Sequence, residues 1–176
     1  YETKVLEDIK LLPNLITKYI EEYDYSEIAN VLKDKEHVFY LGRGIDFYLC
    51  MEGSLKLKEI SYIHSEAFQA GELKHGSISL IDKDFGVVSV VTDKTISDKT
   101  ISNLKEVSAR GAKIIAITNI KDNNFSDYTI VVDSYNEVLN PLLVIVPMQM
   151  LAYNVAKLRG CDIDKPRNLA KSVTVE

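Results

Sequence analysis

Three charged side chains at helical spacing are the first residues that could do chemistry. Glu52, Lys56 and Glu59 are four and three positions apart, so in a helix they lie along one face. A carboxylate with a cation one turn away can be tuned to move protons near neutral pH. The same spacing suits a solvated Glu–Lys ladder worth about 0.2–0.5 kcal/mol per pair. Spacing alone leaves both interpretations open.

A histidine in a turn offers a second group for proton transfer. His75 stands between a lysine and a glycine in the run 69–76, QAGELKHG, so we expect it to be exposed. An ordinary imidazole pKa of about 6.5 suits it to acid–base work. His37 and His64 fall at or within expected strands and are interpreted as structural. No histidine pair has metal-ligand spacing and no Ser-His-Asp order stands out, so no metal site is predicted.

A glycine turn at 41–44, LGRG, could receive an anion at the start of the next helix. The third glycine of a dinucleotide-binding fingerprint is replaced by Phe47, and a P-loop lysine is absent. Asp46 would also repel a phosphate. We therefore do not predict tight nucleotide binding.

The elements that position these groups follow from periodicity. Short, nearly continuous β-branched runs predict buried parallel strands at 38–41, 87–91, 114–117 and 130–132, with a weaker strand at 63–68. Apolar residues at three- and four-residue spacing predict helices over 2–22, 26–35, 97–110 and 137–159. Pro13 should kink the first helix or make it restart, Pro147 should bend the last helix, and Ser26 is a plausible N-cap. The alternation predicts a three-layer α-β-α sandwich with a mostly parallel five-stranded, flavodoxin-like sheet.

Composition narrows the class of protein. The chain has 176 residues, 46% hydrophobic and 27% charged, as expected of one globular domain. A net charge of −5 argues against a nucleic-acid partner. Polar residues and prolines interrupt the apolar stretch 139–155, so no membrane partner is expected. Cys50 and Cys161 suit small core residues of a cytoplasmic protein, and the start at Tyr1 is interpreted as that of a fragment.

Two long runs resemble a known family. The run 52–76, EGSLKLKEISYIHSEAFQAGELKHG, resembles the second sugar isomerase (SIS) domain of glucosamine-6-phosphate synthases, the isomerizing glutamine–fructose-6-phosphate aminotransferases. The ending 164–176, DKPRNLAKSVTVE, resembles the ending of the same family. Ser54, where the family often has alanine, and Ser77, where proline is common, are the departures. The likeness covers essentially the whole chain.

The resemblance implies roles that spacing does not give. Glu59 would be the base that moves a proton between C1 and C2 of fructose 6-phosphate, and His75 would assist ring opening. Lys171 would form a Schiff base with the ketose carbonyl, with Glu52 and Lys56 supporting the site. No cofactor or metal is implied. Residues 1–160 would form the SIS domain, and the tail 161–176, by composition alone a frayed end, would become a lid over the sugar.

The family also implies partners outside this chain. Its sugar phosphate is held by an upstream SIS domain, its ammonia comes from a glutaminase domain, and its active site is shared across a homodimer. We therefore expect the fragment to have little activity alone. Three alternatives stay open: a regulatory phosphosugar-binding module, a sugar-phosphate deaminase or deglycase, and a dimerisation platform built on the helix at 142–155.

Overall fold

Five parallel strands form a single sheet with helices on both faces. The structure, a computed structural model, describes residues 2–169. In chain order its elements are α1 (Glu2–Glu21), α2 (Ser26–Leu32), β1 (His37–Gly42), α3 (Ile45–Ser61), β2 (His64–Gln69), the 3-10 turns η1 (Glu72–His75) and η2 (Ser77–Leu80), β3 (Gly86–Val91), α4 (Ser97–Ser108), β4 (Lys113–Thr118), β5 (Tyr128–Val131) and α5 (Asn140–Leu158).

The strand order is β2-β1-β3-β4-β5, and every neighbouring pair is parallel. This is the order of flavodoxin-like sheets, in which the chain reverses its winding direction between β1 and β3. The predicted fold class is confirmed, and the weakly predicted strand at 63–68 exists as the edge strand β2.

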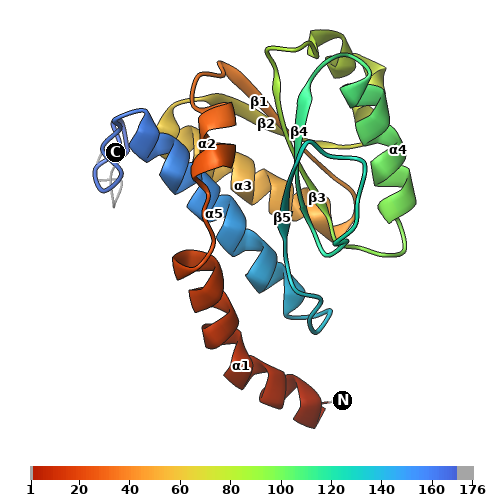
Figure 1. Cartoon of the computed structure of the whole chain (residues 1–176), viewed down its shortest axis with the longest axis vertical. Helices are drawn as coiled ribbons and strands as arrows, with labels where there is room; N and C mark the ends of the chain where they lie inside the picture. Colours follow the sequence, from red (N-terminus) through yellow and green to blue (C-terminus); the bar gives the residue numbers. More distant parts are fainter. Residues whose placement is uncertain (1, 170–176) are drawn as a thin grey trace, which may run out of the picture.

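Two apolar layers hold the sandwich together. One layer packs α2, α3 and α5 against one face of the sheet through side chains such as Leu32, Leu57 and Leu151. The other packs α4 and η1 against the opposite face through Leu104, Val107 and Leu73. Figure 1 shows the same division, with α4 on one side of the strands and α2, α3 and α5 on the other. Because both faces are covered, β1 and β3 are buried almost throughout, which explains their continuous apolar sequences.

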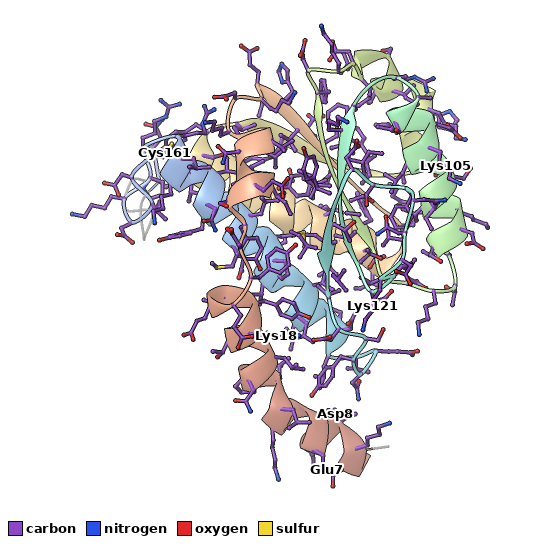
Figure 2. The ribbon with its side chains drawn as sticks, in the orientation of Figure 1. Glu7, Asp8, Lys18, Lys105, Lys121 and Cys161 are labelled. Carbon is purple, nitrogen blue, oxygen red and sulfur yellow. The ribbon has the colours of Figure 1, made fainter. Side chains whose placement is uncertain are left out.

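Helix α1 extends away from the body of the domain (Figure 1). Its inner end is fixed to the segment after β5: Lys18 Nζ lies 2.9 Å from Asp133 Oδ2, and the Tyr19 hydroxyl donates to the same oxygen at 3.1 Å. Farther out, the Asn136 amide donates to Asp8 Oδ2 at 2.8 Å. Figure 2 shows Lys18 at the junction with the body, and Glu7 and Asp8 toward the free end.

Two local predictions need correction. Pro13 lies inside the continuous helix α1, so of the two expected outcomes the restart does not occur. Helix α2 ends at Leu32 rather than near residue 35. Ser26 is the first helical residue and not the cap; its N–H donates to the Asp24 carboxylate at 2.8 Å, because a short acidic side chain readily accepts from a backbone N–H two residues on.

Helix α5 is long and apolar enough to cross a membrane by length and composition. It lies against α3 within the fold, however, and Leu143, Met148 and Leu151 are fully buried there. Core helices of this kind are expected to be apolar nearly all round, so its composition is explained by packing.

Candidate functional site

The predicted charged face exists on α3, and its three side chains are in contact. Lys56 Nζ lies 2.7 Å from Glu59 Oε2 and 3.6 Å from Glu52 Oε1. The hydrogen bond to Glu59 raises the pKa of Lys56, and the negative charges of both carboxylates act in the same direction against a smaller effect of burial. Lys56 is therefore a permanent cation at neutral pH. It can orient Glu59 but is a poor candidate for a nucleophilic amine.

Helix α3 is locked against the sheet beside this cluster. Ser54 is buried, and its carbonyl accepts a hydrogen bond of 2.8 Å from the Ser65 hydroxyl on β2. The two hydroxyls are 3.2 Å apart, so the hydroxyl that distinguishes Ser54 from alanine is satisfied. These contacts fix the rotation of α3 and thus keep Glu52, Lys56 and Glu59 on its outer side.

Glu59 lies in the last turn of α3, far from the carboxyl edge of the sheet. The helix starts beside the end of β1 and returns to the start of β2, with Tyr62 as its C-cap. Fourteen residues separate Ile45 from Glu59, which corresponds to about 21 Å along a helix axis. Glu52, seven residues after Ile45, is nearer to the carboxyl edge than Glu59 but lies in the middle of the helix.

His75 lies at the opposite edge. It ends η1, which follows the carboxyl end of β2, and it is exposed as predicted. The six residues of β2 span about 20 Å. Glu59 lies near the start of this strand and His75 near its end. Lys171 lies outside the described residues. Within one copy of the described chain, the predicted catalytic groups Glu59 and His75 do not meet.

A cleft of about 390 Å³ opens at the carboxyl edge instead. It lies between the first turn of α3, the segments after β3, β4 and β5, and the start of α5. Its polar lining includes Thr92, Asp93, Lys94, Asn119 and Glu137. None of Glu52, Lys56, Glu59 or His75 lines it, and the sequence analysis missed these lining residues. For Thr92, Asp93, Lys94 and Asn119, the position directly after strands β3 and β4 was the signal that could have found them.

A buried carboxylate occupies the anion-binding position beside this cleft. Asp46, in the first turn of α3, is 2% exposed. It accepts hydrogen bonds from Thr92 N at 2.7 Å, Thr92 Oγ1 at 2.6 Å and Asp93 N at 3.2 Å. Burial raises the pKa of Asp46, although these hydrogen bonds act in the opposite direction. The backbone donors that a phosphate would need after β3 are already used, and Asp93 and Glu137 make the lining acidic.

The two remaining histidines form a surface pair at the amino edge. His37 and His64 are register partners on β1 and β2, and their Nδ1 atoms are 3.1 Å apart. Both are exposed, so they are not core residues. Among the described residues, no three His, Cys, Asp or Glu side chains gather as a metal site would require.

Residues 31–159 match the family model described as SIS domain, and the chain belongs to that family. Within it, the chain resembles one group of aminotransferases. It is 45% identical to a glutamine–fructose-6-phosphate aminotransferase (isomerizing) from Caldanaerobacter subterraneus over 99% of its length, but it spans only 30% of that relative.

Two solved structures extend the comparison. The C-terminal domain of glucosamine-fructose-6-phosphate aminotransferase from Francisella tularensis is 38% identical with a TM-score of 0.84; the match covers 92% of this chain and 47% of that one. Glucosamine-6-phosphate deaminase from Thermotoga maritima is 26% identical with a TM-score of 0.69, covering 98% of this chain and 50% of that one. Both solved chains are thus about twice the length of the part that this chain matches.

Proposed function

We propose that this chain is the carboxy-terminal isomerase unit of an enzyme that converts fructose 6-phosphate to glucosamine 6-phosphate with ammonia from glutamine. The substrate and reaction come from the aminotransferases that match almost the whole chain. The structural observation that carries the proposal is the position of Glu59: a carboxylate held 2.7 Å from the cation of Lys56, on the end of the helix that the tail contacts.

The roles of the residues follow from the chemistry. The Lys171 amine would add to the C2 carbonyl of the open sugar and release water, and ammonia would then replace the lysine amine at C2. Glu59 would take a proton from C1 and return one to C2, which converts the ketose imine to the amino aldose. Lys56 and Glu52 would hold the Glu59 carboxylate in place. His75 would assist ring opening.

The binding site of the sugar phosphate is inferred from the cleft at the carboxyl edge. Asp46 fills the donors after β3, and the cleft there is acidic, so we expect the sugar phosphate to be bound by the upstream unit of the full-length enzyme. The separation of Glu59 and His75 supports a homodimer in which one subunit supplies His75 to the site of the other.

We also propose a cytoplasmic location, because Cys50 and Cys161 are both free thiols. We further propose that the tail after residue 160 is a separate functional segment that covers the sugar.

The test uses the full-length enzyme and the fragment side by side. Amino-sugar formation from fructose 6-phosphate and glutamine should fall about 10²–10⁴-fold in Glu59→Gln, since this is the usual contribution of a positioned acid–base group. Glutamine hydrolysis should continue. The isolated fragment should form little glucosamine 6-phosphate from fructose 6-phosphate and ammonia. Full activity of Glu59→Gln would refute the role of Glu59, and robust synthesis by the fragment would refute its dependence on other domains.

The likeness to the Thermotoga deaminase supports one competing function, the deamination of glucosamine 6-phosphate. A deaminase would release ammonia from glucosamine 6-phosphate at a rate far above the synthesis rate and would not respond to glutamine. Measuring both directions on the same full-length preparation separates the two functions. A regulatory module would instead bind the phosphosugar with unchanged affinity after Lys171→Met.

A further inference from the structure

The start of the tail is fixed to the end of α3. After α5 ends at Leu158, the Arg159 guanidinium donates from Nε to the Ser61 carbonyl at 2.9 Å and from Nη1 to the Lys33 carbonyl. Cys161 N donates to the Ala156 carbonyl at 3.0 Å. Figure 2 shows Cys161 where the chain leaves α5, on the side of the domain away from α4. The tail therefore leaves the body beside the last turn of α3.

Six residues farther on, the tail contacts α3 a second time. Arg167 N donates a hydrogen bond of 2.9 Å to the Tyr62 hydroxyl, and its guanidinium carbon lies 4.1 Å from the centre of the Tyr62 ring. The backbone and the side chain of Arg167 thus use both the polar tip and the face of one aromatic ring. Before it, the Asp162 carboxylate accepts from the N–H groups of Asp164 and Lys165 and closes a turn that directs the chain to Tyr62.

Tyr62 has an unusual backbone conformation for a tyrosine. Tyr62 caps α3 with φ of 61°, in the left-handed region. Glycine or asparagine is usual at such a helix end, because a β-carbon is disfavoured there. A tyrosine is a poor choice for ending a helix, so its side chain must be explained by what it contacts, and the described partner of both its ring and its hydroxyl is Arg167.

We propose that Tyr62 and Arg167 are positioning residues that hold the tail at the end of α3 where Glu59 lies. This inference rests on the proposed function and deepens it. Tyr62 is three residues after Glu59, and Lys171 is four residues after Arg167, which limits the distance between the Arg167 and Lys171 Cα atoms to about 14 Å. The contact therefore holds Arg167 at the end of α3 that carries the Glu59 carboxylate.

The size of the effect follows from the number of residues between Lys171 and the last contact of the described tail. Without the Tyr62 contact, the last hydrogen bond from the described tail to the body is at Cys161, ten residues before Lys171 instead of four. Effective concentration falls roughly as the −3/2 power of linker length, so the local concentration of Lys171 at the site should fall about fourfold. Loss of this contact should therefore slow imine formation without abolishing it.

The first experiment measures the contact itself in the present chain. Trypsin does not cut before proline, so the bond after Lys165 is resistant, and cleavage after Arg167 reports release of the tail. Tyr62→Gly removes the ring at a backbone position that suits glycine, so the fold should keep its thermal stability. We expect several-fold faster cleavage after Arg167 in Tyr62→Gly and a smaller increase in Tyr62→Phe, which keeps the ring. An equal rate in wild type and Tyr62→Gly would overturn the proposal.

The second experiment measures the consequence in the full-length enzyme. Borohydride trapping of the imine formed with fructose 6-phosphate should be about fourfold slower in Tyr62→Gly and in Arg167→Met. Glutamine hydrolysis should be unchanged, and Arg167→Lys should restore part of the rate. Arg110→Met, at the end of α4 on the other side of the sheet, serves as the matched control. Unchanged trapping in an active enzyme would overturn the positioning role, whereas a wild type that makes no amino sugar would overturn the proposed function and leave the tryptic result intact.

Discussion

At the scale of single residues, Asp46 and Glu59 show how two carboxylates on one helix acquire different uses. Asp46 faces inward at the start of α3 and accepts three hydrogen bonds from the segment after β3. Glu59 faces outward at the end of α3 and has 27% of its side chain exposed beside Lys56. The Asp46 carboxylate has a structural role, because its three hydrogen-bond donors belong to Thr92 and Asp93 of the same domain. Glu59 remains able to meet a substrate.

Asp46 gives a prediction about stability. Asp46→Ala leaves the Thr92 and Asp93 N–H groups and the Thr92 hydroxyl without their acceptor, and should lower the free energy of unfolding by about 2–4 kcal/mol. Urea unfolding at neutral pH measures this. Thr95→Ala is the control, since Thr95 is exposed and its hydroxyl makes a surface hydrogen bond to the Asp93 carboxylate. A loss below 1 kcal/mol, on the order of one ordinary hydrogen bond, would contradict the assignment of Asp46 as the structural anion of the cleft.

The raised pKa of Asp46 sets the sign of a pH effect. An acid whose folded-state pKa lies above its unfolded value binds its proton more tightly in the fold. Its contribution to stability is therefore greatest below the ordinary value of 3.8 and falls as pH rises through the folded pKa. Asp46→Asn cannot ionise. The free energy of unfolding of the wild type minus that of Asp46→Asn should therefore fall as pH rises from below 3.8 to neutrality. Paired unfolding curves over that range test the sign. A rise of wild-type stability relative to Asp46→Asn would contradict it.

At the scale of elements, the close approach of α3 and α5 depends on one glycine. A β-carbon on Gly53 would lie 2.5 Å from Met148 Sδ and 3.0 Å from a ring carbon of Tyr40, both of which are fully buried. Gly53→Ala should therefore cost about 1–3 kcal/mol through overpacking, despite the better helix propensity of alanine. Adding Met148→Ala should make the combined loss clearly smaller than the sum of the two single losses. Strict additivity in denaturant unfolding would contradict this packing.

The strands could be predicted from the sequence because their environment is uniform. β1, β3 and β4 are covered on both faces, so apolar residues run through them with few interruptions. β2 was predicted less firmly because Ser65 and Glu66 interrupt its apolar pattern. Ser65 is tolerated since it bonds to Ser54, a contact between two elements that no local pattern reveals. Likewise, Pro13 does not end α1, whose course is set by its contacts with the segment after β5.

The candidate site could be predicted only in part. Spacing correctly placed Glu52, Lys56 and Glu59 on one face of a helix, because 3.6 residues per turn is a fixed property. It did not show that Glu59 would lie near the amino edge of the sheet. That position follows from the length and direction of α3, which returns from the carboxyl edge to β2. The Tyr62–Arg167 contact joins positions 105 residues apart and has no sequence signal at all.

At the scale of the whole molecule, the described domain exposes apolar side chains on two of its helices. The outer side of α3 exposes Ile45, Tyr48, Met51 and Leu55 next to the charged cluster, and the outer part of α1 exposes Leu6 and Leu11. Apolar stripes of this kind mark contact surfaces. The chain spans 30% of the aminotransferase and about half of the solved chains that it matches. A site around Glu59 that is completed by further protein is consistent with both observations.

The separation of Glu59 from His75 leads to a prediction about subunits. If the partner supplies His75, a full-length Glu59→Gln subunit and a His75→Ala subunit can rescue each other. Random reassembly of equal amounts gives half mixed dimers, and each mixed dimer has one site with both wild-type groups and one with neither. Synthase activity should then rise from near zero for each variant to about one quarter of wild type. Two groups acting within one subunit would give no recovery, because every site would lack one of them. Refolding the variants separately before mixing provides the control: activity should appear only under conditions that allow subunits to exchange.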